Sequence, residues 1–171
     1  MFGRMTSDLR SVLVRAWLAT ATVDFLFACT LAVVAYHSTV ARVWQGVAST
    51  VLGPSSFDGG ARTIAIGIAM HLGVALLWTS VFFALYHAWP ALRRVVSTPA
   101  GMVGAAVVYG PLIWTVMSFV VIPLVTKHPL PTINPRWIGQ AVGHMFFVAL
   151  PMVTVIARGG APRHASVLAP A

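Results

Sequence analysis

The sequence predicts an all-α membrane protein with four transmembrane helices, built as a single integral membrane domain over residues 1–171. Hydrophobic residues make up 58% of the chain and charged residues only 8%, and the mean hydropathy is +0.87. These values lie far from those of a soluble domain. Runs of about 20 apolar residues, the length that crosses a hydrocarbon layer of about 30 Å, lie near residues 16–36, 63–86, 99–125 and 137–157.

Charge adds an orientation to these four spans. The chain has eleven Lys and Arg against three acidic residues, a net charge of +8 that would suggest a nucleic-acid partner in a soluble protein. Here the basic residues flank apolar runs, so we interpret them as topology signals and expect no nucleic-acid partner. One side holds Arg4, Arg10, Arg15, Arg93, Arg94, Arg158 and Arg163, and the other holds Arg42, Arg62, Lys127 and Arg136. The larger group predicts that both termini are cytoplasmic and that the loop around residues 37–61 is periplasmic.

The first span, near residues 16–36, follows a basic lead-in, "MFGRMTSDLRSVLVR", which also suits a signal peptide. We expect a retained helix, because the apolar run is too long, Asp24 interrupts it and no small-x-small cleavage site follows. Trp17, Tyr36, Trp89 and Trp137 lie at the expected ends of spans, where their rings prefer the headgroup layer. The single cysteine, Cys29, excludes an intramolecular disulfide.

The first long loop contains a short amphipathic helix near residues 39–52. Apolar residues in "VARVWQGVASTVLG" recur at steps of three and four, which is typical of a helix lying in the membrane interface. Gly53 and Pro54 should end it, and Asp58 or a glycine should cap the second span. In the later loop, Asn134 and Pro135 suit the N-cap and first residue of the fourth span.

The second and fourth spans share a short pattern, "HLGVAL" from His71 and "HMFFVAL" from His144. It suggests two pseudo-repeated hairpins related by an axis along the membrane normal. Gly139 and Gly143 form a GxxxG pair, which favours close helix approach. Pro111 should kink the third span.

Depth arithmetic places one polar residue of each span near the midplane. At 1.5 Å per residue, Asp24, His71, Tyr109 and His144 all lie about 10 to 15 Å from the start of their spans, and Gln140 lies one turn before His144. Such a layer could act as hydrogen-bonding struts between helices. It could also be a working site, since ionisable groups are rare inside membranes. Both interpretations stay open.

The order of motifs resembles a known family. "ATVDFLFA" in the first span, "VLGPSSFDGGARTIAIGIAMHL" leading into the second, "VYGPLIWTVMSFVVIPL" in the third and "GHMFFVALPM" in the fourth are similar to a family of small four-span bacterial inner-membrane proteins of uncharacterised function. The resemblance covers residues 15–157. It implies the four-span fold and the bacterial cytoplasmic membrane, and it assigns no substrate, cofactor or site residue.

Three functions fit these features. The favoured one is an accessory or assembly subunit of a larger membrane complex, with lipid and other membrane subunits as partners. A haem b electron-transfer protein would use His71 and His144 as axial ligands. A small proton or metal-ion carrier would use Asp24, His71, Tyr109 and His144 as its relay. An enzyme is less expected, because the sequence shows no nucleotide motif and no nucleophile beside a base.

Overall fold

The computed structural model describes residues 2–126 and 130–160, with side chains described from residue 8 onward. Every regular element in these residues is a helix, and four helices are long and apolar enough to cross a membrane, which confirms the predicted fold class. The spans are Asp8–Val34, Gly60–Ala88, Pro99–Thr126 and Pro135–Gly159, of 27, 29, 28 and 25 residues. The chain is therefore a multi-pass helical membrane protein.

The elements follow one another in a simple up-and-down order. The first two spans are formed by α1 (Phe2–Val34) and α3 (Gly60–Ala88). The third consists of α5 (Pro99–Val116), the π-helical η2 (Met117–Val121) and α6 (Ile122–Thr126). The fourth consists of α7 (Pro135–Gly143), the π-helical η3 (His144–Ala149) and α8 (Leu150–Gly159). The connections add α2 (Val40–Leu52), the 3₁₀ turn η1 (Pro54–Asp58) and α4 (Pro90–Val95).

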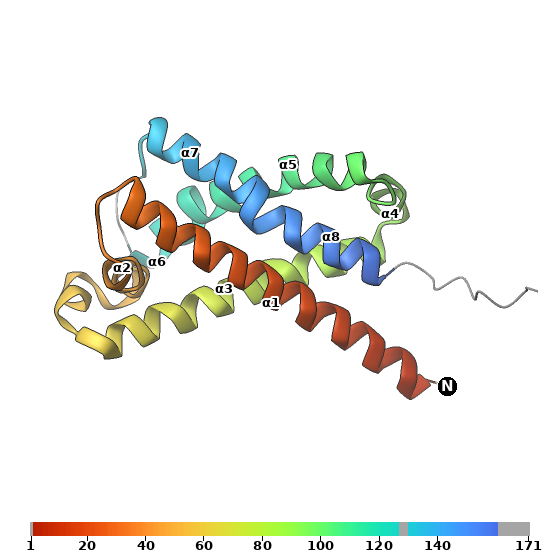
Figure 1. Cartoon of the computed structure of the whole chain (residues 1–171), viewed down its shortest axis with the longest axis horizontal. Helices are drawn as coiled ribbons and strands as arrows, with labels where there is room; N and C mark the ends of the chain where they lie inside the picture. The colour runs from red at the N-terminus through yellow and green to blue at the C-terminus, as the bar shows by residue number, and fades with distance from the viewer. Residues whose placement is uncertain (1, 127–129, 161–171) are drawn as a thin grey trace, which may run out of the picture.

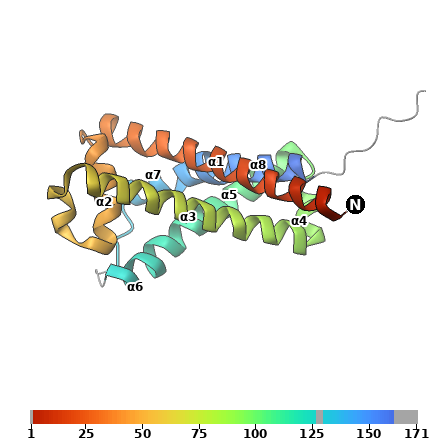
Figure 2. The same ribbon diagram turned by 90° about the horizontal axis from the view of Figure 1, so that it is seen from below.

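The bundle has two distinct ends, which Figures 1 and 2 show from two sides. The "α2 end" carries α2, η1 and the start of α7, and the "α4 end" carries α4, the start of α1 and the end of α8. The second and fourth spans therefore run in the same direction, from the α2 end to the α4 end. This parallel arrangement is what the pseudo-repeat requires, although the repeat itself stays a prediction.

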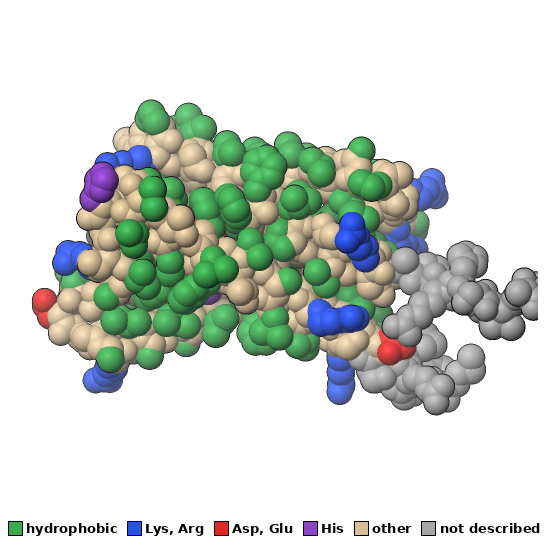
Figure 3. Space-filling model, in the orientation of Figure 1, with side chains coloured by type: hydrophobic (Ala, Val, Ile, Leu, Met, Phe, Trp, Pro, Cys, Tyr) green, Lys and Arg blue, Asp and Glu red, His purple; other side chains and the backbone are tan. Residues whose placement is uncertain are grey.

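Charged side chains lie at the two ends of the molecule, while the middle of the face seen in Figure 3 is mostly apolar. Among the described side chains, the α4 end carries Arg10, Arg15, Arg93, Arg94 and Arg158, and the α2 end carries Arg42, Arg62 and Arg136. This division matches the two groups that the sequence predicts. Arg4, Lys127 and Arg163 lie outside the described side chains.

The amphipathic segment forms α2, within one residue of the expected bounds at each end. The Thr39 hydroxyl accepts a hydrogen bond from the Arg42 amide, and Gly53, at a φ of 77°, ends the helix. Trp44 and Ala48 are buried against the bundle, whereas Val40 and Val51 stay exposed. A Cβ on Gly67 of α3 would lie 1.9 Å from the Trp44 carbonyl oxygen. Helix α2 thus lies against the bundle with its backbone in close contact with α3.

Trp17 lies deeper in its helix than expected, and only one glycine of the GxxxG pair allows the expected close approach. Trp17 does not lie at the end of its helix, because α1 continues to Phe2 without a breaker, and its indole N–H donates to the Leu72 carbonyl at 2.9 Å. The glycines of the GxxxG pair do not act together. A Cβ on Gly143 would meet the Phe27 ring, whereas one on Gly139 would meet nothing within 4 Å. Only Gly143 permits a close helix contact.

Prolines accompany both π-helical segments. Pro123 follows η2 and Pro151 follows η3, each two residues beyond the last π residue. Proline has no amide hydrogen and its ring collides with the carbonyl four residues earlier, so a widened turn before it relieves the conflict. Around Pro111, where the sequence suggests a kink, the α-helix continues to Val116. The change of helix type comes only at Met117 in this span and at His144 in the fourth.

The core fills the half of the bundle near the α4 end. Its buried members come from α1, α3, α5, η3 and α8 and include Val12, Ala16, Phe82, Tyr86, Tyr109, Ile113, Met152, Val153 and Ile156. Met152, Val153 and Ile156 have no exposed surface at all. This half therefore separates the α4 end from the polar groups described next.

Candidate functional site

Asp24 of α1 faces His71 of α3 inside the bundle. The carboxylate oxygen Oδ2 lies 3.6 Å from the imidazole Nδ1, and the two side chains are 21% and 10% exposed. This is the one ion pair in the part of the chain that the structure describes. An ionised Asp24 facing lipid would cost about 2.5 kcal/mol or more, so a partner in the interior is what its position demands.

The other nitrogen of His71 fixes where its proton resides. Nε2 lies 3.0 Å from the carbonyl oxygen of Ala21. A carbonyl can only accept, so Nε2 must carry the hydrogen, and Nδ1 faces Asp24. A neutral His71 then presents a lone pair to the carboxyl group, and a charged His71 presents a second N–H. A single proton can therefore reside on either side of the Asp24–His71 contact.

His144, the first residue of η3, belongs to a segment that packs against α1 close to Asp24, since its neighbour Gly143 lies against the Phe27 ring. Its Nδ1 donates to the Gln140 carbonyl at 2.8 Å, so the lone pair of a neutral His144 is on Nε2. We call Asp24 and His71, together with His144 on the adjoining η3, the Asp–His cluster.

Close backbone contacts hold His144 in place. A Cβ on Gly110 of α5 would lie 2.5 Å from the His144 carbonyl oxygen, and Gly143 lies against the Phe27 ring of α1. Because neither glycine has a side chain, η3 can approach α5 and α1 together. The π-helical η3 thus lies where it contacts both α5 and α1. Such π-helical turns are frequent at functional sites.

Aromatic rings enclose both histidines. Trp44 of α2 meets the His71 ring edge-on at 5.1 Å between ring centroids, and Phe25 stacks on Trp44 at 4.5 Å. On the other side, the Trp114 ring lies 4.9 Å from that of His144. The sequence pattern did not predict that Trp44 and Trp114 contact the histidine rings. Gly67, one turn before His71, is the one residue that could have indicated a close approach of another backbone to this part of α3.

Two cavities lie near the cluster. A cavity of about 330 Å³ opens at the α2 end, and its mostly apolar wall includes Trp114 and Trp137 together with Asn134, Arg136 and Gln140. The Gln140 carbonyl and the Trp114 ring contact His144 directly. An apolar cavity of about 260 Å³, lined by α2, α3 and the third span, has His71 in its wall. The cavity at the α2 end therefore reaches two residues that contact His144.

Tyr109 does not join the cluster. Its hydroxyl donates to the Trp78 carbonyl at 2.9 Å, and its ring packs on Phe82 in the apolar core. Trp78 lies seven residues beyond His71, about 10 Å along the helix axis. Side chains on a helix lean toward its N-terminus, so Tyr109 of α5 leans toward the α4 end while His71 leans toward the α2 end. Depth arithmetic on Cα positions misses this difference.

The site does not suit a haem or a metal ion. Bis-histidine ligation needs one free nitrogen on each imidazole, whereas both nitrogens of His71 face partners on α1. Within residues 2–126 and 130–160, no three His, Cys, Asp or Glu side chains group as metal ligands. The donors fit a proton better than a metal.

Fold and site together define a small multi-pass helical membrane protein with an Asp–His cluster inside its bundle. Comparison with models of known protein families, with curated proteins and with solved structures finds no match.

Proposed function

We propose that this protein takes up and releases a proton at the Asp–His cluster, in exchange with the aqueous phase at the α2 end. The observation that carries the proposal is the geometry of His71. With Nε2 committed to Ala21, the only exchangeable proton of the Asp24–His71 contact lies between Nδ1 and the carboxyl group. Transfer of the proton within the pair leaves its net charge unchanged, and release of the proton to water leaves an ionised Asp24 beside a neutral His71.

The surroundings support exchange from one side. The cavity at the α2 end reaches Gln140 and Trp114, which both contact His144, so a proton from the α2 end can reach the cluster through His144. Toward the α4 end the path runs into side chains such as Phe82 and Met152, which are at most 2% exposed. A bundle closed on one side suits a proton-binding or proton-coupled role better than an open channel.

The proposal places the chain in a bacterial inner membrane with both termini cytoplasmic, so the cluster would exchange protons with the periplasm. Membership of the four-span family that the motifs resemble is part of the same proposal. The accessory-subunit role stays a prediction. It requires no titrating group in the bundle, whereas proton exchange requires one. An experiment that detects a titrating group therefore distinguishes the two functions.

Infrared difference spectroscopy can test the proposal, because the chain has only three acidic side chains, Asp8, Asp24 and Asp58. We expect reconstituted protein to show a carboxylic-acid C=O band that appears and disappears with pH. The Asp24→Asn variant keeps the side-chain shape but cannot ionise, so it should lack the band. Asp58→Asn, in η1 at the α2 end, is the matched control and should retain it.

Size-exclusion profiles identical to wild type would show that both variants fold. A titrating band that survives in Asp24→Asn and vanishes in Asp58→Asn would refute proton exchange at the cluster. Absence of any titrating carboxyl band in the wild-type protein would refute it equally and would favour a structural role for Asp24, as the accessory-subunit prediction requires.

A further inference from the structure

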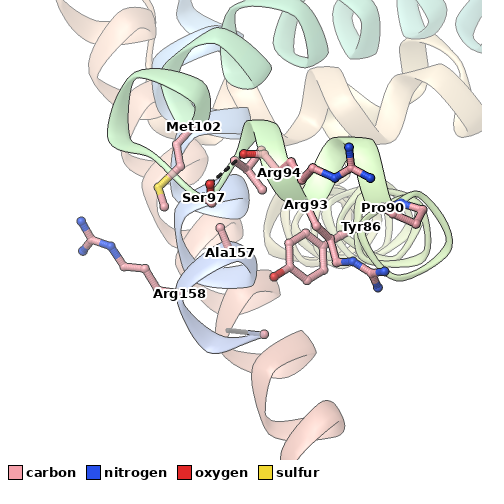
Figure 4. A pocket seen from close by; sticks show the side chains of 10 residues that line it. Tyr86, Pro90, Arg93, Arg94, Ser97, Met102, Ala157 and Arg158 are labelled. Atoms are coloured by element: carbon pink, nitrogen blue, oxygen red, sulfur yellow. Dashed lines mark hydrogen bonds between the residues drawn. The ribbon is translucent and has the colours of Figure 1, made fainter. Parts of the chain in front are cut away.

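A second, chemically different cavity lies at the opposite end of the molecule. It has a volume of about 710 Å³ and is lined by α4, the end of α3 and the end of α8. Figure 4 shows Arg93 and Arg94 on one side of it and Arg158 on the other, with the Tyr86 ring between them. None of these residues belongs to the Asp–His cluster.

The cavity concentrates positive charge without a protein counterion. Arg93 donates to the His87 carbonyl at 3.0 Å, which leaves most of its five N–H groups free. No described carboxylate lies within 4 Å of any of the three guanidinium groups, since the one ion pair in the described residues is Asp24–His71. Three like charges around one cavity repel one another, and a bound anion would relieve that repulsion.

Tyr86 adds a polar group to this cavity. The side chain is only 6% exposed, and it forms part of the cavity wall. The ring is fixed by an edge contact with His87 at 5.2 Å. A tyrosine hydroxyl at a cavity wall can donate a hydrogen bond to an acceptor of a bound ligand.

The location indicates the source of the anion. Helix α4 connects two membrane spans, and Trp89, which precedes it, is 58% exposed, as is typical of a tryptophan in the headgroup layer. Phosphate groups of lipids lie at this level. Guanidinium groups bind phosphate oxygens in pairs, with better geometry than lysine.

We propose that this cavity binds a phosphate group, supplied by the headgroup of an anionic lipid or by free phosphate. Arg93, Arg94 and Arg158 line the cavity and would turn their guanidinium groups toward the phosphate, and Tyr86 would donate its hydroxyl. The inference is independent of proton exchange at the Asp–His cluster, which lies beyond the apolar core.

Thermal unfolding of the detergent-purified full chain tests the site. Phosphatidylglycerol should raise the Tm of the wild-type protein more than phosphatidylcholine does. Because each charge-assisted contact of a guanidinium with the phosphate contributes about tenfold in affinity, Arg94→Gln with Arg158→Gln should weaken phosphatidylglycerol binding about 100-fold. Arg10→Gln with Arg15→Gln removes the same charge from α1 at the same end, outside the cavity, and should leave the lipid effect unchanged.

Inorganic phosphate distinguishes the two sources. Equal stabilisation by phosphate would make free phosphate sufficient, and stabilisation by phosphatidylglycerol alone would require the lipid headgroup. Tyr86→Phe, which keeps all charges, should weaken binding severalfold. Equal Tm shifts with both lipids and none with phosphate would overturn the proposal, as would a full phosphatidylglycerol effect in the Arg94/Arg158 variant.

Discussion

The two histidines of the cluster are held in opposite ways. His71 uses Nε2 to bond a neighbouring helix, whereas His144 uses Nδ1 to bond its own helix one turn earlier. The sequence could indicate both residues, and Asp24, because ionisable side chains stand out within apolar runs. It could not indicate which nitrogen of each ring donates a hydrogen bond to a carbonyl, since that depends on the carbonyls that the packing brings near.

Tyr109 provides a test of the cluster's membership at the residue level. Tyr109→Phe removes the hydrogen bond to the Trp78 carbonyl, so we expect a loss of about 1 kcal/mol in the free energy of unfolding. The ring contact with Phe82 stays, and the titrating infrared band of Asp24 should stay with it. Loss of that band in Tyr109→Phe would place the tyrosine in the proton-exchanging site, contrary to its position here.

At the level of elements, the apolar runs predicted the four spans well because membrane-crossing length and helical hydrogen bonding leave few alternatives. The segment near residues 39–52 was predicted as a helix from its periodicity. Its place in the membrane interface stays a prediction. Trp44 packs on His71 while Val40 and Val51 stay exposed, because periodicity shows that a face is apolar but not what covers each residue. The π-helical turns at Met117 and His144 were missed, although Pro123 and Pro151 mark both.

The contact of α2 with α3 depends on Gly67, which has no side chain. Gly67→Ala would place a Cβ against the Trp44 backbone, which cannot rotate away, so we expect a loss of about 1 to 3 kcal/mol. Gly73→Ala in the same helix meets nothing within 4 Å and should be neutral or stabilising by up to about 1 kcal/mol. Thermal unfolding of both variants in one detergent is the measurement. Equal Tm values would show that α2 does not require this close approach.

At the scale of the whole molecule, the sequence places seven basic residues on one side of the membrane and four on the other. This division predicted which connections lie at the same end of the bundle. In the structure, α2 with η1 lies at one end, and α4 lies with the start of α1 at the other. The number of basic residues also predicts which end faces the cytoplasm, because positive loops are retained there. That orientation requires a measurement in cells.

Cysteine labelling in intact cells provides it. In a Cys29→Ala background, Ser55→Cys places a thiol in η1 and Ala91→Cys places one in α4, both at exposed positions. We expect a membrane-impermeant reagent to label residue 55 and to reach residue 91 only after the cells are opened. Labelling of residue 91 alone in intact cells would invert the topology and move proton exchange to the cytoplasmic side.

The central claim is that Asp24 and His71 share a proton and that His144 belongs to the same proton-exchanging site. Site-resolved ¹⁵N NMR of the imidazoles in reconstituted protein tests it most directly, because protonated and unprotonated ring nitrogens have distinct shifts. The account predicts that neutral His71 is protonated on Nε2 and neutral His144 on Nδ1, and that Asp24→Asn changes the pH titration of both rings. The same tautomer on both residues, or a His144 titration unaffected by Asp24→Asn, would contradict it.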